Sequence, residues 1–355
     1  MATAEAMRRT AIPRPILTGL GIAAIAGLLV VTYFAIQEQF WAQTRNGLTL
    51  GSIYAMIALG YTMVYGVLQL INFAHSEVFM IGTVVTLFAF RNWFSVTEPL
   101  GGFTLVLVIV GALIPAMLAS GFTAVALERV AYRPLRKRGS PRLAFLISAI
   151  GASFAISYAF NLMDGNHFLL DLRLPDILGA TPQAVPIVME SEPAFTVLDT
   201  PVQNTRILVV VVAVVMMVAL DRFVRYTRVG RGIRAVAQDA ETASLMGVNI
   251  DRMVMYTFLI GGLMAGAAGT LWGVFFHTAR WNIGFLPGIK AFTAAVLGGI
   301  GNIRGAMAGG LLLGLVEAYG SAAIGAQWKD AFAFIVLVVV LMFRPTGLFG
   351  ERTGA

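Results

Sequence analysis

The polar stretch from Arg222 to Arg252 interrupts an otherwise apolar chain and contains the signals of a short capped helix. Asp239 is suited to cap the first turn, and Glu241 places a negative charge near the positive end of the helix dipole. Gly247 can adopt the left-handed conformation that ends a helix. Small residues recur at positions i, i+3, i+4 and i+7 and therefore share one face: Ala240, Ala243, Ser244 and Gly247.

A face made only of small residues lets another protein approach closely. The sequence therefore predicts a docking helix at Asp239–Gly247, within a coupling loop that covers residues 222–252. The alternative is a solvated loop with an incidental helix.

The sequence lacks the motifs that would make the chain an enzyme in its own right. It contains no G-x-x-x-x-G-K-[ST] loop to hold ATP phosphates, and neither the G-x-S-x-G nor the H-E-x-x-H pattern occurs. There is no cysteine, and the three histidines lack metal-ligand spacing: His75, His167 and His277. We expect no catalytic site, no metal and no cofactor, and any ATP hydrolysis would belong to a partner.

The composition of the chain indicates a membrane protein. Hydrophobic residues make up 58% and charged residues 12% of the 355 residues, and the mean hydropathy is +0.81. This leaves too little polar surface for a soluble globule. The net charge of +7 does not indicate a nucleic-acid partner, because the arginines lie between apolar runs, where they set orientation. We expect one all-α domain over residues 1–355, in contact with membrane lipid.

Apolar windows of about 20 residues predict about ten membrane spans, several of them short. The predicted spans are 16–36, 46–70, 77–91, 103–128, 143–162, 207–221, 253–276, 286–303, 305–325 and 329–343. Three GxxxG patterns predict close helix packing. They begin at Gly262, Gly305 and Gly310.

The charges of the loops predict the orientation. The loop at residues 129–142 carries six basic residues and no acid, whereas the loop at residues 163–206 carries six acids against two arginines. The positive-inside rule places the first loop in the cytoplasm and the second in the periplasm. Basic residues before the first span and after the last place both termini in the cytoplasm. The coupling loop then also lies on the cytoplasmic side.

Two predicted spans are interrupted by polar or glycine-rich segments, at Asn72–Glu77 and at Gly298–Gly305. Irregular backbone at membrane depth must be buried in protein or line a cavity, so both segments are candidates for a transport path. Their places in opposite halves of the chain suit a pair of structural repeats, although no sequence repeat is evident. The candidate path residues are Asn72, His75, Glu77, Gly299, Gly301, Asn302 and Glu317.

Ionisable side chains within apolar segments usually mark function, because each costs about 2.5–3.5 kcal/mol on insertion scales. Glu317 lies in the middle of the run Leu311–Ala323, where it must face the bundle interior, pair with a partner or be protonated. His75 and Glu77 follow the second span, and their position is also that of a turn at the membrane surface.

Several blocks of sequence carry a family resemblance. The segments Asn46–Ala55, Leu59–Gly66 and Ile71–His75 closely resemble the opening of branched-chain amino-acid ABC importer permeases. Three further blocks of that family follow in the expected order: Gly230–Asn249, Lys290–Asn302 and Phe343–Gly350. The spacing E-T-A-S-L-M-G resembles the E-A-A-x-x-x-G loop by which such permeases engage their ATPase.

The resemblance has two departures and one insertion. Thr242 replaces the second alanine of E-A-A, and Ser76 stands where the family pattern predicts glycine. The acidic segment Leu169–Asn204 is longer than the family pattern predicts.

The resemblance implies a type II ABC-importer-like permease of the bacterial inner membrane, with short or broken helices. It implies a heterodimer with a second permease, two cytoplasmic ATP-binding subunits and a periplasmic substrate-binding protein. The implied substrates are branched-chain or related small amino acids. Urea, short amides or aromatic acids are alternatives within the same type of importer. An ion-coupled secondary transporter is a further alternative, which would require paired acids or a sodium site within broken helices.

Overall fold

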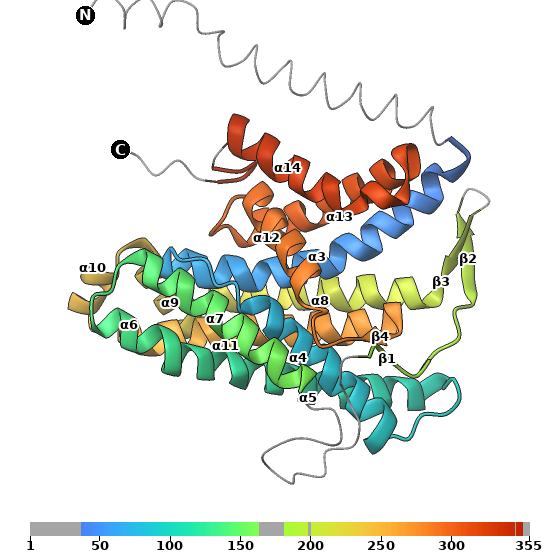
Figure 1. Cartoon of the computed structure of the whole chain (residues 1–355), viewed down its shortest axis with the longest axis horizontal. Helices are drawn as coiled ribbons and strands as arrows, with labels where there is room; N and C mark the ends of the chain where they lie inside the picture. Colours follow the sequence, from blue (N-terminus) through green and yellow to red (C-terminus); the bar gives the residue numbers. More distant parts are fainter. Residues whose placement is uncertain (1–36, 163–180, 198–199, 345, 351–355) are drawn as a thin grey trace, which may run out of the picture.

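The computed structural model describes residues 37–162, 181–197, 200–344 and 346–350. Figure 1 shows a bundle of helices with a small amount of strand at one end. The long apolar helices are α3 (Phe40–Leu68), α5 (Gly102–Leu127), α7 (Arg142–Asn161), α8 (Asn204–Tyr226), α11 (Ile250–Phe276), α13 (Ile303–Ile324) and α14 (Lys329–Phe343).

Shorter elements connect or interrupt these helices. They are η1 (Gln37–Gln39), α4 (His75–Phe88), the π-helices η2 (Ala89–Trp93) and η3 (Glu128–Tyr132), α6 (Arg133–Lys137), α9 (Arg228–Gln238), α10 (Ala240–Leu245), α12 (Phe285–Gly298) and η4 (Ala326–Trp328). Two antiparallel pairs of strands are also present, which the all-α prediction did not include. They are β1 (Gln183–Ala184) with β4 (Thr278–Ala279), and β2 (Pro193–Val197) with β3 (Thr200–Gln203).

Every span predicted after residue 40 coincides with a helix, but the number that can cross a membrane is smaller. Seven helices within the described residues are long and apolar enough, with η3 and α6 extending α5 and η4 extending α14. The predicted spans 77–91 and 286–303 became α4 and α12, each of 14 residues. A helix of that length rises about 21 Å, against a hydrocarbon thickness of about 30 Å. The predicted span 16–36 lies outside the described residues.

The bundle has two distinct ends, which Figure 1 shows at the left and the right. The first, called here the α10 end, carries α6, α9 and α10, and the second, called here the strand end, carries the four strands. Helix α3 runs from the strand end to the α10 end, and α11 and α13 run the other way. Most arginines of the described connecting segments lie at the α10 end.

Two long helices end in the same unusual way. Gln69 after α3 and His277 after α11 both adopt the left-handed conformation with φ of 52°, and each donates its backbone N–H four residues back, to Tyr65 and Gly273. After each cap the chain turns back into the bundle and begins a short helix there, α4 in one case and α12 in the other. Helix α4 then runs to the strand end, and α12 runs to the α10 end.

These caps belong to two similar groups of helices. In the first group α4 packs between α5 and α11, and in the second α12 packs between α13 and α3. The helices α3, α4 and α5 therefore follow one another as α11, α12 and α13 do, long, short and long. The two groups run in opposite directions through the bundle. This arrangement has the form of inverted-topology repeats. In this arrangement the counterpart of the segment between α3 and α4, which holds Asn72, is the segment between α11 and α12, so Asn72–Glu77 and Gly298–Gly305 are not equivalent positions of the two groups.

Glycines allow the closest helix crossings. A Cβ added to Gly314 of α13 would lie 2.4 Å from the carbonyl oxygen of Gly47 on α3, and one added to Gly266 of α11 would lie 2.5 Å from the carbonyl oxygen of Ala116 on α5. Contacts this short leave room only for hydrogen. The GxxxG patterns at Gly262 and Gly310 are thus packing motifs, as predicted.

Candidate docking helix and transport path

The predicted capped helix is confirmed. The Asp239 carboxylate accepts hydrogen bonds from the backbone N–H groups of Glu241 and Thr242 at 2.9 and 3.1 Å, and α10 follows from Ala240 to Leu245. The Thr242 hydroxyl donates to the same carboxylate, and these bonds hold the pKa of Asp239 below its usual value. Gly247 has φ of +82°, the left-handed conformation predicted for the end of the helix.

The exposed face of α10 is not the predicted one. Ala243 is only 5% exposed because it packs back onto the chain, and Ala240 is half-buried, so these two small residues are turned away from any partner. Ser244 and Gly247 are exposed, as is Glu241. The most prominent apolar side chains are instead those of Leu245 and Met246, which are 83% and 80% exposed.

Helix α10 is tied to the bundle through the start of α11. The backbone N–H of Val248 bonds to the carbonyl of Ala243, and the Asn249 side chain caps α11. One turn on, Asp251 pairs with Arg136 at 2.5 Å, and Arg136 also pairs with Glu128 at 3.2 Å. Glu128 lies at the end of α5 and is fully buried. Helix α10 therefore adjoins the start of α11, and the charge cluster ties that start of α11 to the end of α5.

The segment Asn72–Glu77 lies inside the protein. Asn72, His75 and Glu77 are 2%, 1% and 1% exposed, so the interpretation of this segment as a turn at the membrane surface is wrong. The His75 ring packs edge-on against Tyr61 at 4.8 Å, about 10 Å along the axis from the end of α3. The chain can enter to this depth because Gly60 leaves room, since a Cβ there would lie 2.0 Å from the imidazole.

Glu77 lies where α4 and α12 begin. One of its carboxylate oxygens accepts hydrogen bonds from the hydroxyls of Ser153 on α7 and Ser76, at 3.1 and 3.4 Å. The other oxygen is buried without a hydrogen-bond partner among the described residues. A Cβ on Gly284, the residue before α12, would lie 2.2 Å from the Ser76 carbonyl oxygen and 3.2 Å from this free oxygen. The first turns of α4 and α12 therefore touch.

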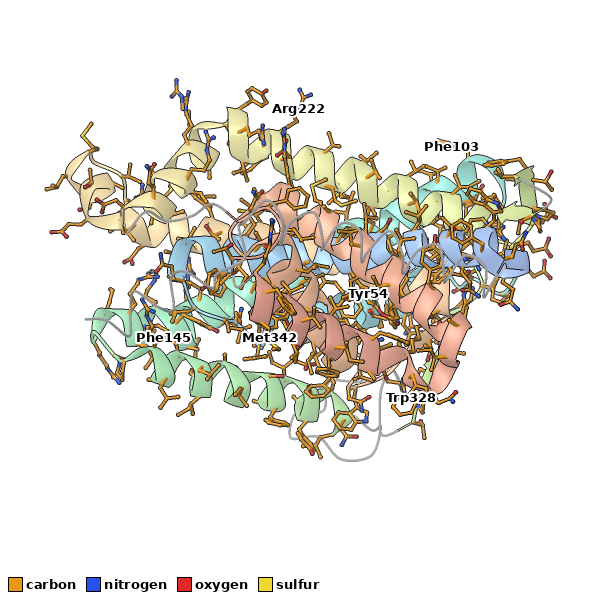
Figure 2. The ribbon with its side chains drawn as sticks, turned by 90° about the horizontal axis from the view of Figure 1, so that it is seen from above. Tyr54, Phe103, Phe145, Arg222, Trp328 and Met342 are labelled. Carbon is orange, nitrogen blue, oxygen red and sulfur yellow. The ribbon has the colours of Figure 1, made fainter. Side chains whose placement is uncertain are left out.

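Glu317 has the partner that its buried position requires. Its carboxylate pairs with Lys290 of α12 at 2.8 Å and with Lys329 of α14 at 3.3 Å, and it accepts a hydrogen bond from Tyr54 at 3.3 Å. Lys290 also pairs with Asp330 at 2.6 Å. Figure 2 shows Tyr54 in the interior of the bundle, whereas Phe103 lies at its edge. The cluster joins four helices, α3, α12, α13 and α14.

The Gly299–Asn302 loop lies at the α10 end, where the C-terminal segment covers it. Gly299 and Gly301 have φ of 103° and 94°. The Asn302 side chain caps α13 through the Gly305 N–H at 3.0 Å, and it donates to the Phe349 carbonyl at 2.9 Å. Glu77, beside the start of α12, and the Gly299–Asn302 loop, at its end, are therefore separated by the length of α12, about 21 Å. Both polar atoms of the Asn302 side chain therefore form hydrogen bonds within the protein.

Sequence reasoning missed several residues of these sites. Lys290 was part of a recognised block but was not identified as the counter-ion of Glu317, and Ser153 was not connected with Glu77. Tyr132 donates to the Asn72 side chain at 2.9 Å and so helps to fix that segment. A lysine in a predicted apolar span was the one available signal, because the other contacts join elements that are far apart in the chain.

These features together define a class of protein. Long apolar helices, two short helices that meet inside the bundle, buried charges at broken helices and an exposed, capped helix at one end are typical of a multi-pass membrane transport protein. The described residues contain no group of three or more His, Cys, Asp or Glu side chains that could hold a metal ion.

Comparison with known proteins identifies the family. The family described as "Branched-chain amino acid transport system / permease component" matches residues 43–341, and the chain belongs to this family. The high-affinity branched-chain amino acid transport system permease protein LivH of Salmonella typhimurium is 43% identical, covering 88% of this chain and 96% of the relative. BraD of Pseudomonas aeruginosa is 41% identical over 87% and 95% of the two chains. A probable LivH of Methanocaldococcus jannaschii is 23% identical over 84% and 89%. No solved structure matched the chain significantly.

Proposed function

We propose that this chain forms the membrane path of an ABC importer for branched-chain or related small amino acids, which a periplasmic binding protein delivers. The observation that carries the proposal is the similarity to LivH and BraD over almost their whole length. The alternative substrates urea, short amides and aromatic acids remain within the same type of importer. An ion-coupled mechanism has less support, because Glu317, the acid in the middle of an apolar run, is already paired with Lys290 and Lys329.

The proposed partners are two cytoplasmic ATP-binding subunits and a second permease. Leu245 and Met246 suit an apolar groove on an ATP-binding subunit, and the charge cluster at Arg136 would pass movement of α10 to α5 and α11. The outer faces of α5, α7, α8 and α14 are exposed and apolar, and they are available to lipid and to a second permease. Asp239, Ala240, Glu241, Ala243, Ser244 and Gly247 form the proposed coupling element, with Leu245 and Met246 now at its contact surface.

The transport path is proposed to follow the two short helices that begin inside the bundle, α4 and α12. Asn72, His75 and Glu77 would border its middle, and Gly299, Gly301 and Asn302 would border its α10 end. Glu317 is proposed to hold the helices around the path through its ion pairs, which is a narrower role than direct contact with substrate. The fold would be that of a type II-like permease of about ten segments, of which α4 and α12 enter without crossing.

The importer would be tested with the assembled complex. This chain, its second permease, the ATP-binding subunits and the binding protein are purified together and reconstituted in liposomes. We expect uptake of radiolabelled leucine, isoleucine or valine that requires both ATP and the binding protein. Uptake of urea, acetamide or an aromatic acid in place of these would transfer the assignment to that substrate. Uptake driven by an ion gradient without ATP would contradict the proposal.

The α10 end is proposed to be cytoplasmic, with both termini on that side, and the strand end with the loop 163–206 periplasmic. The concentration of arginines at the α10 end supports this orientation. Because the chain contains no cysteine, the labelling of a single introduced cysteine shows on which side of the membrane that residue lies. An impermeant maleimide added to the periplasmic side should label Thr196→Cys, in β2, and should not label Lys137→Cys, in α6. The reverse pattern would invert the topology.

A further inference from the structure

Three glutamates among the described residues are almost completely buried, and their partners differ. Glu128 pairs with Arg133 and Arg136, both at 3.2 Å, and Glu317 pairs with Lys290 and Lys329. Within the described residues Glu77 forms no ion pair, and the groups that hydrogen-bond to its carboxylate are the hydroxyls of Ser76, Ser153 and Ser157. A buried carboxylate without a basic partner is costly, and a cation from outside the chain would remove that cost.

The surroundings of Glu77 suit such a cation. Glu77 lies in the first turn of α4, and its free oxygen lies beside Gly284, the N-cap of α12, so both helices direct their positive ends toward it. Those dipoles favour a negative charge at this point. The free oxygen makes no hydrogen bond within the described residues. Glu77 as a whole is 1% exposed. One acceptor is thus available at a place where the backbone already supports negative charge.

We propose that Glu77 accepts the α-ammonium group of the transported amino acid, an inference that rests on the proposed function. The bond is a charge-assisted hydrogen bond between the ammonium and the Glu77 oxygen that has no partner among the described residues. The substrate then supplies the basic partner that Lys290 supplies to Glu317. This assigns the substrate a primary ammonium group, which urea, amides and aromatic acids without an amino group lack.

The position of Glu77 also fits alternating access. Helix α4 leads from the junction to the strand end, and α12 leads from it to the α10 end, so the junction can be approached from either side. The structure shows it closed, with the backbone at Gly284 against Ser76. Because only small groups meet there, a modest separation of the two helix starts uncovers Glu77. Substrate from the strand end would meet this carboxylate before it passes along α12.

The first test replaces the carboxylate with an amide. The Glu77→Gln complex, with all its partners in liposomes, should assemble because the amide oxygen still accepts from Ser76 and Ser153. Its ATPase activity should still respond to loaded binding protein, whereas leucine uptake per ATP hydrolysed should fall by at least about tenfold, the effect of losing a hydrogen bond to a charged group. Glu77→Asp should recover part of the uptake. Equal uptake by the Gln and wild-type complexes would overturn the proposal, since a protonated structural group tolerates this change.

A second pair of variants does not depend on how Glu77→Gln folds. Ser153→Lys places a permanent ammonium beside Glu77 on the partly exposed helix α7, and Ser153→Met is its uncharged control of similar length. We expect Ser153→Lys to lose leucine uptake and Ser153→Met to retain most of it, with both complexes assembled. Equal uptake by the two variants would overturn the role of Glu77. If the proposed function itself is wrong, the wild-type complex will take up no branched-chain amino acid. That result differs from failure of the Glu77 proposal alone, in which the wild-type complex still takes up leucine.

Discussion

Replacing Leu245 and Met246 together with serine is expected to detach the ATP-binding subunits from this permease. The two side chains are 83% and 80% exposed at the tip of a helix that the chain holds rigidly by its cap. Burial of a leucine and a methionine side chain in a partner's groove is worth about 3–6 kcal/mol together. Losing that contact corresponds to roughly a 10²- to 10⁴-fold weaker association. Co-purification of the ATP-binding subunits and substrate-stimulated ATPase activity would both decrease.

A matched control separates this effect from a general effect of removing exposed apolar groups. Phe195 and Val197 are also exposed, at 53% and 42%, but they lie in β2 at the strand end. The Phe195→Ser, Val197→Ser variant should co-purify with the ATP-binding subunits as the wild type does. If the Leu245, Met246 variant also retains them with full ATPase stimulation, then α10 is not the docking helix.

The sequence predicted this helix well because capping is local chemistry. Asp239 and Gly247 act through the backbone of their immediate neighbours, so residue type and spacing were sufficient to place both ends. Which face lies outward depends on how α10 packs against α9 and α11, the helices before and after it in the chain, and spacing alone does not give that packing. The small-residue face was therefore assigned to the partner, although Ala243 packs against the chain itself.

The short helices α4 and α12 show a similar limit of prediction from sequence. Hydropathy located α4 and α12 because both are apolar, but it could not distinguish a helix that crosses the membrane from one that begins inside the bundle. That distinction is made by the left-handed caps at Gln69 and His277 and by the space at Gly60, which only the folded chain reveals. The irregular segment Asn72–Glu77 was nonetheless recognised, because its polar residues interrupt an apolar run.

Buried charges were located by sequence, but their partners were not. Glu317 was conspicuous as one acid in an apolar run, and the physical rule that it must pair or be protonated was sound. Its partner Lys290 lies 27 residues away on another helix. The same reasoning gave no partner for Glu77, and the structure gives it hydroxyl groups only. The contrast between these two glutamates is therefore a property of tertiary packing.

Adding one methyl group at Gly314 is expected to destabilise the protein strongly. The new Cβ would lie 2.4 Å from the carbonyl oxygen of Gly47 and 2.5 Å from the backbone of Gly51, and backbone atoms cannot rotate away as a side chain can. Helices α3 and α13 would have to separate, at a cost of about 1–3 kcal/mol or more. The separation would also strain the bond between Tyr54 and Glu317, which joins the same two helices.

Gly151 is the matched control for Gly314→Ala. It also lies inside a long helix, α7, but an added Cβ there meets no atom within 4 Å. Gly151→Ala should be neutral or stabilising by up to about 1 kcal/mol, because alanine favours helix more than glycine does. Thermal unfolding of the purified variants should therefore show an unchanged or higher melting temperature for Gly151→Ala and a decrease on the order of 5 °C for Gly314→Ala. Equal melting temperatures for Gly314→Ala and the wild type would contradict the close crossing of α3 and α13, and with it the frame that holds α12 and its buried charges in place.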